Sequence, residues 1–170
     1  MKILQFITHT IAFAMVVASL VSCSEKTEQQ QVIHQAVAME SSDECHLCGM
    51  LITRFDGPKA ELFRQETGEQ VFKFCSTRNM FSYYLDPENK RNITQILVHD
   101  MSKMPWGSDS IDDKYFIDAK VAWYVVGSEK SGAMGKTLAS FSIESDALAF
   151  AKEFGGQLLS FKEVTLNTLM

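Results

Sequence analysis

The sequence gathers no positive charge in one place. Its 16 Lys and Arg residues are scattered among 21 Asp and Glu residues, which leaves a net charge of −5. Proteins that bind nucleic acid carry a basic patch that neutralises phosphate groups, and no such run occurs here. We therefore expect no nucleic-acid partner.

The sequence also lacks a recognisable pair of groups for acid–base catalysis. The neighbouring carboxylates at Asp43-Glu44 and Asp112-Asp113 lie in polar stretches that predict solvated loops. Catalytic acids and bases need surroundings that shift their pKa values, and a solvated loop does not supply them. We therefore expect a binding protein and not an enzyme.

The longest apolar stretch lies at the N-terminus and predicts an export signal. Lys2 gives a short basic start, residues 3–20 are almost wholly apolar, and Leu20-Val21-Ser22-Cys23 follows. A stretch of this length can also span a membrane. Cys23 favours the signal, because leucine three residues before it and a small residue just before it resemble a bacterial lipobox. That resemblance implies that residues 1–22 are removed and that Cys23 is acylated, which anchors the protein in a membrane.

A polar tether is predicted to follow the anchor over residues 23–42. This stretch contains a glutamine run at 29–31 and only a weak apolar patch, a composition that is typical of a linker. We expect His34 to be solvated there. We also expect a location on the periplasmic face of the membrane, and Ser24 after the acylated cysteine favours the outer membrane.

Three thiols remain once Cys23 is acylated, namely Cys45, Cys48 and Cys75. An exported protein lies in an oxidising compartment, where free thiols are uncommon. Three thiols form at most one internal disulfide, so at least one is left over. Holding a metal ion would give the remaining thiol a role and protect its thiolate from oxidation.

Soft metal ligands concentrate in residues 43–50, whose sequence is Asp-Glu-Cys-His-Leu-Cys-Gly-Met. The thiolate of Cys48 and the thioether of Met50 suit Cu(I) better than a hard cation. Gly49 lets the chain bend, and an extended chain would instead place His46, Cys48 and Met50 on one face. Either geometry brings the two sulfurs together. We therefore predict a Cu(I) site with Cys48 as anchor, Met50 as second ligand and His46 as a candidate third.

Alternating apolar residues and turn residues predict the strands. We expect them at residues 51–55, 60–65, 70–74, 93–98, 121–126, 138–141, 157–161 and 164–166. Ser76 is predicted to cap a helix that runs through Leu85, and Ser142 a helix that runs through Phe154 and ends at Gly155-Gly156. Both halves of the chain therefore show the order strand, strand, helix, strand. The sequence predicts an α+β fold, a single compact domain over 43–170 of two related β-β-α-β halves, about 43–106 and 107–170, after the signal peptide and the polar tether.

His99 and Asp100 end one predicted strand, and Met101 and Met104 follow closely. These residues either form a second soft metal site or terminate the strand by bonding to the backbone. The second alternative is the more common role of such residues.

Several short motifs occur in an order that resembles one known family. They are Cys23, Cys48-Gly49-Met50, Gly57-Pro58-Lys59-Ala60, Val98-His99-Asp100-Met101, Ile117-Asp118-Ala119, Tyr124-Val125-Val126-Gly127-Ser128 and Gly132-Ala133-Met134-Gly135. Over about residues 43–161 the sequence resembles the NosL family, the accessory lipoproteins of nitrous-oxide reductase.

This resemblance implies a lipoprotein that binds Cu(I) and acts as a copper chaperone for the assembly of nitrous-oxide reductase. It implies that the reductase and its associated maturation transporter are partners. The family's Cys-x-Met motif falls on Cys48 and Met50, and its Gly-x-Met-Gly element makes Met134 a further candidate ligand. Cys45 and Cys75 exceed the family's minimal pattern. They pair with each other, add ligands or stay idle, and the sequence leaves this open.

Two other functions use the same cysteines. A structural zinc module could combine Cys45, Cys48 and Cys75 with a histidine, because zinc prefers four nitrogen or sulfur ligands. A thiol-disulfide oxidoreductase could use Cys45 and Cys48 as its dithiol. Such a dithiol usually begins a helix, whereas the sequence after Cys48 predicts a strand.

Overall fold

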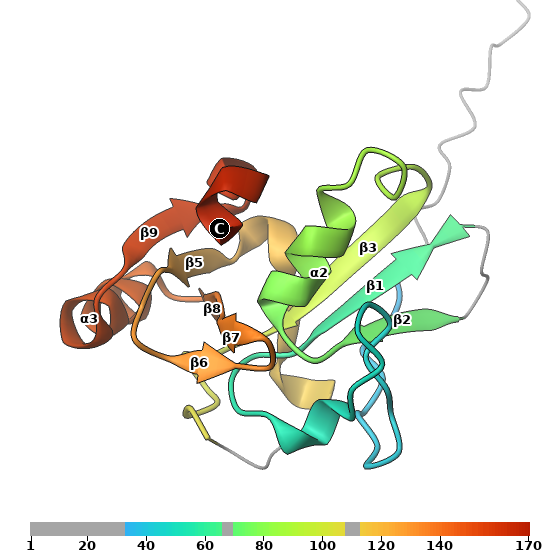
Figure 1. The fold of residues 1–170 in the computed structure, drawn as a ribbon, viewed down its shortest axis with the longest axis horizontal. Coiled ribbons are helices and arrows are strands. Elements are labelled where there is room, and N and C mark those ends of the chain that lie inside the picture. The colour runs from blue at the N-terminus through green and yellow to red at the C-terminus, as the bar shows by residue number, and fades with distance from the viewer. Residues whose placement is uncertain (1–32, 66–69, 108–112) are drawn as a thin grey trace, which may run out of the picture. The chain divides into compact units, whose positions relative to one another are not determined.

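In the part of the chain that the structure describes, two larger antiparallel sheets, each accompanied by one helix, form most of the fold (Figure 1). The structure is a computed structural model that describes residues 33–65, 70–107 and 113–170. The predicted signal peptide and the acylation site at Cys23 lie outside the described residues. Among the helices that are described, none has the length and apolar content that crossing a membrane requires.

The first half of the domain contains β1 (Ala60–Arg64), β2 (Val71–Phe74), α2 (Thr77–Tyr84) and β3 (Ile93–His99). Strand β1 lies in the middle, antiparallel to both neighbours, with Leu62 opposite Phe72 on one side and Ile96 on the other. The sheet order is β2-β1-β3-β4, in which β4 (Phe116–Asp118) comes from the second half of the sequence. The first sheet therefore has the predicted β-β-α-β core and one added edge strand.

The second half repeats this arrangement with β5 (Trp123–Val126), β8 (Ala139–Phe141), α3 (Glu144–Phe154) and β9 (Gln157–Ser160). Its sheet order is β8-β5-β9, so the first strand of the unit is again central. A small hairpin of β6 (Ser131–Gly132) and β7 (Gly135–Lys136) is inserted between β5 and β8. The prediction of an α+β domain with two related β-β-α-β halves is confirmed.

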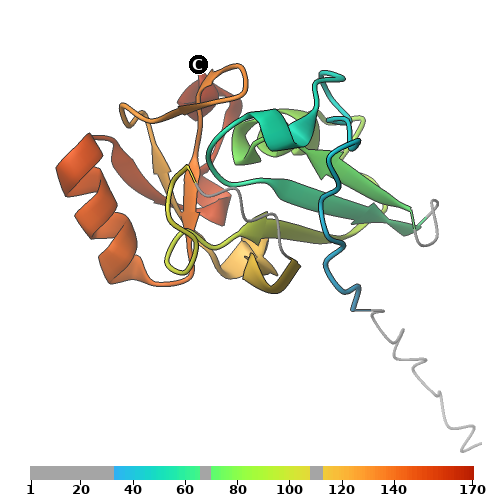
Figure 2. The ribbon, with the colours of Figure 1, turned by 90° about the horizontal axis from the view of Figure 1, so that it is seen from below.

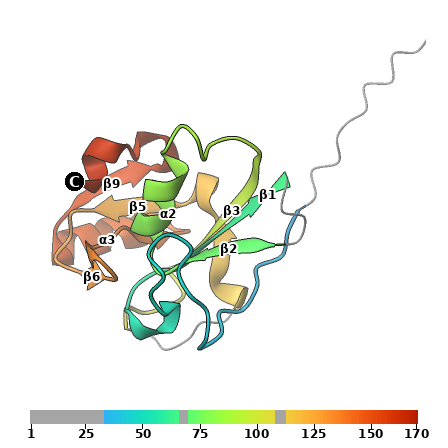
Figure 3. The same cartoon turned by 45° about the vertical axis from the view of Figure 1, so that its right-hand side comes forward.

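Helix α2 lies between the strands of the two sheets (Figures 1 and 3). Phe81 on this helix packs edge-on against Tyr124 of β5, with ring centroids 5.0 Å apart, and also contacts Phe161 after β9. The hydroxyl of Tyr124 donates to the carbonyl oxygen of Ala119 at 2.6 Å, which satisfies its polar atom inside the core. One hydrophobic core therefore joins both halves and holds α2 in place.

Different contacts determine where the two helices begin and where α3 ends. Ser76 caps α2 as predicted, because its hydroxyl oxygen accepts the backbone N–H of Asn79 at 3.1 Å. Ser142 does not cap α3, which begins at Glu144 without a side-chain cap. The backbone N–H and the hydroxyl of Ser142 donate instead to the buried carboxylate of Asp100. Gly155 ends α3 as predicted, with a φ of 73° that favours glycine.

Two predicted strands are wrong. Residues 51–55 contain a 3-10 turn at Ile52–Arg54, and only Leu51 makes a bridge, to Glu44. The turn places Ile52, which is fully buried, in the core. Of residues 164–166, the first two lie between the 3-10 turns Phe161–Glu163 and Leu166–Leu169, and Leu166 begins the second turn. Reciprocal side-chain and backbone bonds at the starts of both turns satisfy local donors, and such bonds compete with strand pairing.

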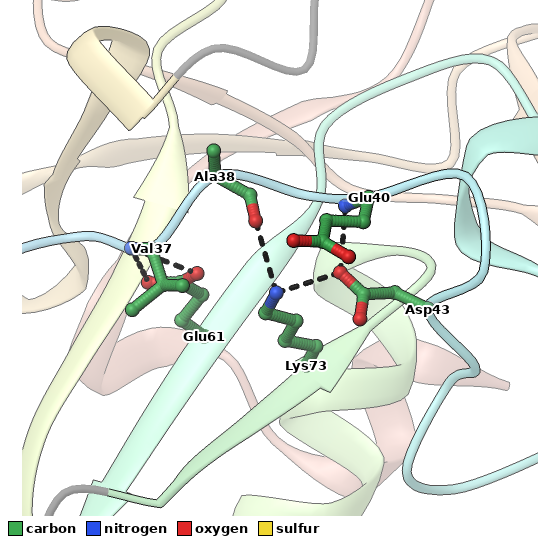
Figure 4. A network of polar contacts seen from close by, with 6 residues as sticks. All are labelled: Val37, Ala38, Glu40, Asp43, Glu61 and Lys73. Carbon is green, nitrogen blue, oxygen red and sulfur yellow. Dashed lines mark hydrogen bonds and ion pairs between the residues drawn. The ribbon is translucent and has the colours of Figure 1, made fainter.

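The last part of the predicted tether lies on the first sheet. We call residues 33–40 the N-terminal strap, and Figure 2 shows this segment crossing the strands of that sheet. The backbone N–H of His34 donates to Gln95 at 2.7 Å, and its ring stacks on Phe63 with centroids 4.4 Å apart. The backbone N–H of Val37 donates to the buried carboxylate of Glu61 at 3.1 Å (Figure 4). His34 is therefore half-buried and held, contrary to the prediction that it is solvated.

Candidate metal centre

Three cysteine thiols meet at one place in the first half of the domain. The Sγ atoms of Cys45, Cys48 and Cys75 all lie within 4.8 Å of one another, and those of Cys48 and Cys75 are 3.6 Å apart. All three are free thiols. We call this group the thiol cluster. Over residues 33–65, 70–107 and 113–170, no other group of at least three His, Cys, Asp or Glu side chains is close enough to hold a metal ion.

A closed loop places Cys45 and Cys48. The backbone N–H of Cys45 donates to the carbonyl of Met50, and that of Gly49 donates to the carbonyl of Cys45, both at 2.8 Å. Gly49 has a φ of 70°, so the chain bends here and does not continue as a strand. The N–H of His46 donates to the carbonyl of Lys73 at 2.8 Å, which attaches the loop to β2. Of the two geometries considered for this segment, the structure has the bend.

The junction between β2 and α2 supplies the third thiol. Phe74 at the end of β2 pairs with Ala60, and the N–H of Thr77 donates to the carbonyl of Pro58 at 3.1 Å. Cys75 lies between these two fixed points and is fully buried. The capped start of α2 therefore positions a sulfur that is 27 residues away from Cys48 in sequence.

The side-chain amide of Asn79 faces all three sulfurs. Its Nδ2 lies 3.3 Å from Sγ of Cys75, 3.5 Å from Sγ of Cys48 and 3.7 Å from Sγ of Cys45. Asn79 is 4% exposed, and its backbone is fixed by the Ser76 cap. The cluster is therefore closed on one side by a neutral hydrogen-bond donor.

The three sulfurs differ in protonation and in access. The hydrogen bond from the Cys75 thiol lowers the pKa of Cys45 well below its usual range, in spite of the opposing effect of burial. The same hydrogen bond, together with burial, raises the pKa of Cys75. A thiolate is therefore available at neutral pH. Cys45 and Cys75 are buried, whereas Cys48 is partly exposed and provides the access to solvent.

The other predicted ligands have different surroundings. Met50 is half-buried and belongs to the same closed loop. His46 is not part of the thiol cluster, because its ring stacks on Phe72 with centroids 4.0 Å apart and packs edge-on against Tyr83. Although His46 is exposed overall, the partial desolvation of its ring lowers the pKa of its imidazole. Met134 lies in the turn between β6 and β7 and is 63% exposed.

The structure thus brings Cys48 together with the two cysteines that the sequence left open. No motif in the sequence predicts a role for Asn79. The signal that could have found Cys75 is its position directly after a strand and directly before a capping serine, a place where side chains are fixed. The signal for Asn79 is its spacing. It follows Cys75 by four residues at the start of a helix, and side chains with this spacing lie on the same face.

One lysine links this site to the N-terminal strap (Figure 4). Nζ of Lys73 donates to the carbonyl of Ala38 at 2.9 Å and to the carboxylate of Asp43 at 2.6 Å. The same carboxylate accepts the N–H of Glu40 at 2.7 Å. Burial raises the pKa of Asp43, but the bonds from Lys73 and Glu40 outweigh it and the pKa is lowered. Lys73 therefore holds together the strap and the start of the loop that carries Cys45 and Cys48.

We expect Lys73→Met to lower the free energy of unfolding by about 1–3 kcal/mol, because the change leaves the partly buried Asp43 carboxylate without its cation. Urea unfolding followed by circular dichroism measures this. Lys162, which is exposed, provides the control, and Lys162→Met should change stability by less than about 0.5 kcal/mol. Equal effects of the two substitutions would contradict the role given to Lys73.

The chemistry of the cluster favours a soft ion. Three sulfurs from two elements, one of them reachable from solvent, match the low coordination numbers and sulfur preference of Cu(I). A structural zinc site needs four ligands in a closed tetrahedron, and the nearby histidine of the loop is stacked on Phe72 outside the cluster. Fold and site together define a class of protein, a small α+β domain in which three thiols lie close enough together to hold a metal ion.

The family follows from comparison with known proteins. A family model described as NosL matches residues 36–169, and the chain belongs to this family. It is 44% identical over 155 residues to the copper-binding lipoprotein NosL of Stutzerimonas stutzeri, which covers 91% of this chain and 78% of the relative. It is 32% identical over 158 residues to the copper-binding lipoprotein NosL of Achromobacter cycloclastes, with 91% and 80% covered.

A solved structure agrees with this assignment. The crystal structure of the copper chaperone NosL from Shewanella denitrificans matches with a TM-score of 0.74 and 52% sequence identity. The match covers 78% of this chain and 97% of that chain. The α+β architecture described above is therefore that of the family.

Proposed function

We propose that this protein binds one Cu(I) ion at the thiol cluster and transfers it to an acceptor protein. The observation that carries the proposal is the meeting of three free thiols within 4.8 Å of one another. The names of the relatives, copper-binding lipoprotein and copper chaperone, support copper as the metal. Since a transfer protein performs no chemical conversion, we propose a carrier and not an enzyme.

The proposed ligands are the sulfurs of Cys45, Cys48 and Cys75. Thiolates are soft donors, and one thiolate already balances the charge of Cu(I). Met50 is proposed as an additional thioether ligand, because it closes the same loop as Cys45 and Cys48. His46 and Met134 remain predictions, and His46 would have to leave its stack on Phe72 to join the three thiols.

Transfer would take place on the side of Cys48. This sulfur is the partly exposed member of the cluster, so a donor atom of the acceptor can approach the ion there. A two- or three-coordinate Cu(I) ion accepts one more ligand before it loses an old one. The family resemblance implies that the acceptor is nitrous-oxide reductase, with its maturation transporter as a further partner. We also propose that Cys23 is acylated and holds the domain at the periplasmic face of the membrane.

An anaerobic titration of the purified protein with Cu(I), in competition with a chromophoric chelator, tests this function. We expect one equivalent to bind tightly and to be held against an equal concentration of Zn²⁺. The metal-free protein should keep its circular dichroism spectrum, because one core joins both halves without a metal. Failure of the protein to bind Cu(I), or its unfolding when zinc is removed, would support a structural zinc module instead.

The same cysteines allow a test of the oxidoreductase alternative. The loop that holds Cys45 and Cys48 is a turn closed by Met50, and not the start of an α-helix. Redox dithiols usually have the first thiol at such a start, where the helix dipole stabilises the thiolate. We therefore expect no insulin reduction by the protein in the presence of dithiothreitol above the uncatalysed rate.

A further inference from the structure

The side-chain amide of Asn79 lies where it would meet the metal. The three Sγ atoms form a triangle with sides of at most 4.8 Å, and Nδ2 lies 3.3, 3.5 and 3.7 Å from its corners. These three distances are longer than the distance from the centre of such a triangle to its corners. The nitrogen therefore lies above the plane of the sulfurs, over the triangle.

A metal ion bound by all three sulfurs would take a position close to this nitrogen. Metal–thiolate bonds are about 2.3 Å long, so an ion at the centre of the triangle would be only about 2.6 Å from Nδ2. The amide presents its N–H donors at this position, and their partial positive charge faces the cation. A metal-bound thiolate can still accept an N–H group, so the conflict is one of space and charge. An ion in the plane of the three sulfurs would lie too close to Nδ2 for the amide to keep its present position.

We propose that Asn79 is a positioning residue that holds the three sulfurs together in the metal-free protein and that the ion displaces its amide on binding. This inference rests on the proposed function of the thiol cluster. The amide turns away or presents its carbonyl oxygen when the ion enters, and it returns when the ion leaves. Because its hydrogen bonds stabilise only the metal-free state, Asn79 weakens copper binding and speeds release, as transfer requires.

Two substitutions separate the hydrogen bonds of Asn79 from its bulk. Asn79→Leu keeps a side chain of similar size without N–H donors, and Asn79→Ala also removes the volume above the sulfurs. In competition titrations with a Cu(I) chelator, we expect both variants to bind about tenfold more tightly than the natural protein, a change of about 1.4 kcal/mol. Release of the ion to the chelator should be slower by a similar factor. Asn167, which is exposed, provides the control, and Asn167→Ala should leave affinity and release unchanged.

A purely structural role for Asn79 gives the opposite result. Loss of core packing would weaken copper binding, so weaker or unchanged affinity in a folded Asn79→Leu variant would overturn the proposal. If the natural protein itself binds no Cu(I), the proposed function fails and not this inference alone. Natural protein that binds Cu(I) beside variants of equal affinity contradicts only the role of Asn79.

Nuclear magnetic resonance of the natural protein tests the displacement without any substitution. The side-chain NH₂ resonances of Asn79 are expected to shift when one equivalent of Cu(I) is added, and their exchange with water should become faster as the N–H···S bonds are lost. The NH₂ resonances of Asn167 should not move. Resonances of Asn79 that keep their positions and their slow exchange in the copper-loaded protein would show that the amide stays in place.

Discussion

Replacing Cys75 by serine is expected to lower the Cu(I) affinity by about a hundredfold or more, which corresponds to about 2.7 kcal/mol. The serine hydroxyl is a hard, protonated donor and does not replace a thiolate on a soft ion. Cys75 is fully buried at the start of α2, so no other side chain can move into its place without disturbing the core. We expect Cys48→Ser to have an effect of similar size.

The measurement is the same anaerobic competition titration, carried out on the folded variants. Cys23→Ser is the matched control, because it removes the proposed acylation site and leaves all three members of the thiol cluster. Its affinity should equal that of the natural protein. An affinity of Cys75→Ser within a factor of three of the natural value would mean that Cys48 and its loop bind the ion without the third thiol.

Replacing Asp100 by alanine is expected to lower the free energy of unfolding by about 3–5 kcal/mol. The carboxylate of Asp100 is fully buried and accepts the N–H of Ser102 at 3.0 Å and the N–H of Ser142 at 2.8 Å. It also accepts the hydroxyl of Ser142 at 2.6 Å. Alanine would leave these donors unpaired at the point where the end of β3 meets the segment before α3.

Urea unfolding followed by tryptophan fluorescence measures this loss. Asp118 provides a matched aspartate that makes one exposed capping bond, to the N–H of Lys120 at 2.7 Å. Asp118→Ala should lower stability by only about 1 kcal/mol. A loss of less than 1 kcal/mol for Asp100→Ala would show that this carboxylate does not join the two halves.

Two roles were considered for His99 and Asp100, a second soft metal site or the termination of a strand, and the contacts of both residues favour the second. The structure has His99 fully buried at the end of β3, where its Nδ1 accepts the N–H of Lys59 at 3.3 Å. Asp100 bonds to backbone N–H groups, as residues that terminate strands commonly do. Among the described residues, the thiol cluster is the one group of close His, Cys, Asp and Glu side chains that suits a metal.

Local sequence patterns predicted most of the fold. The strands β1 and β3, the Ser76 cap and the glycines after α3 depend on a few neighbouring residues, and each is present as predicted. The capping role given to Ser142 failed because a distant buried carboxylate competes for its donors. The strand predicted at residues 51–55 is instead a 3-10 turn that buries Ile52 and leaves Leu51 half-buried, with a single bridge to Glu44.

The candidate site was predicted only in part, for a similar reason. The softness of thiolate and thioether predicts Cys48 and Met50 as ligands from a few neighbouring residues, and the structure places Cys48 in the thiol cluster. Cys75 reaches the cluster through the pairing of β1 with β2, in which Phe74 lies opposite Ala60. Register over such a distance is set by the core as a whole and is not visible in one sequence. The side chain of Asn79 has its role only because this register is formed.

The N-terminal strap gives the same lesson about composition. The polar composition of residues 23–42 as a whole predicts a linker, yet the strap, which contains the weak apolar patch of that stretch, lies on the first sheet. Side chains of the strap take part, since the His34 ring stacks on Phe63 and Met39 is buried in the core. Other contacts are backbone groups of the strap bound by side chains of the sheet, at Val37 and Ala38. Contacts of this kind depend little on the side chains of the strap, so its own composition does not reveal them.

X-ray absorption at the copper edge of the Cu(I)-loaded protein tests the central claim most directly, because it counts the sulfur atoms bound to the ion. We predict at least three sulfur neighbours in the natural protein and one fewer in Cys75→Ser. A first shell with two sulfurs or fewer, completed by nitrogen or oxygen, would contradict binding by Cys45, Cys48 and Cys75 together.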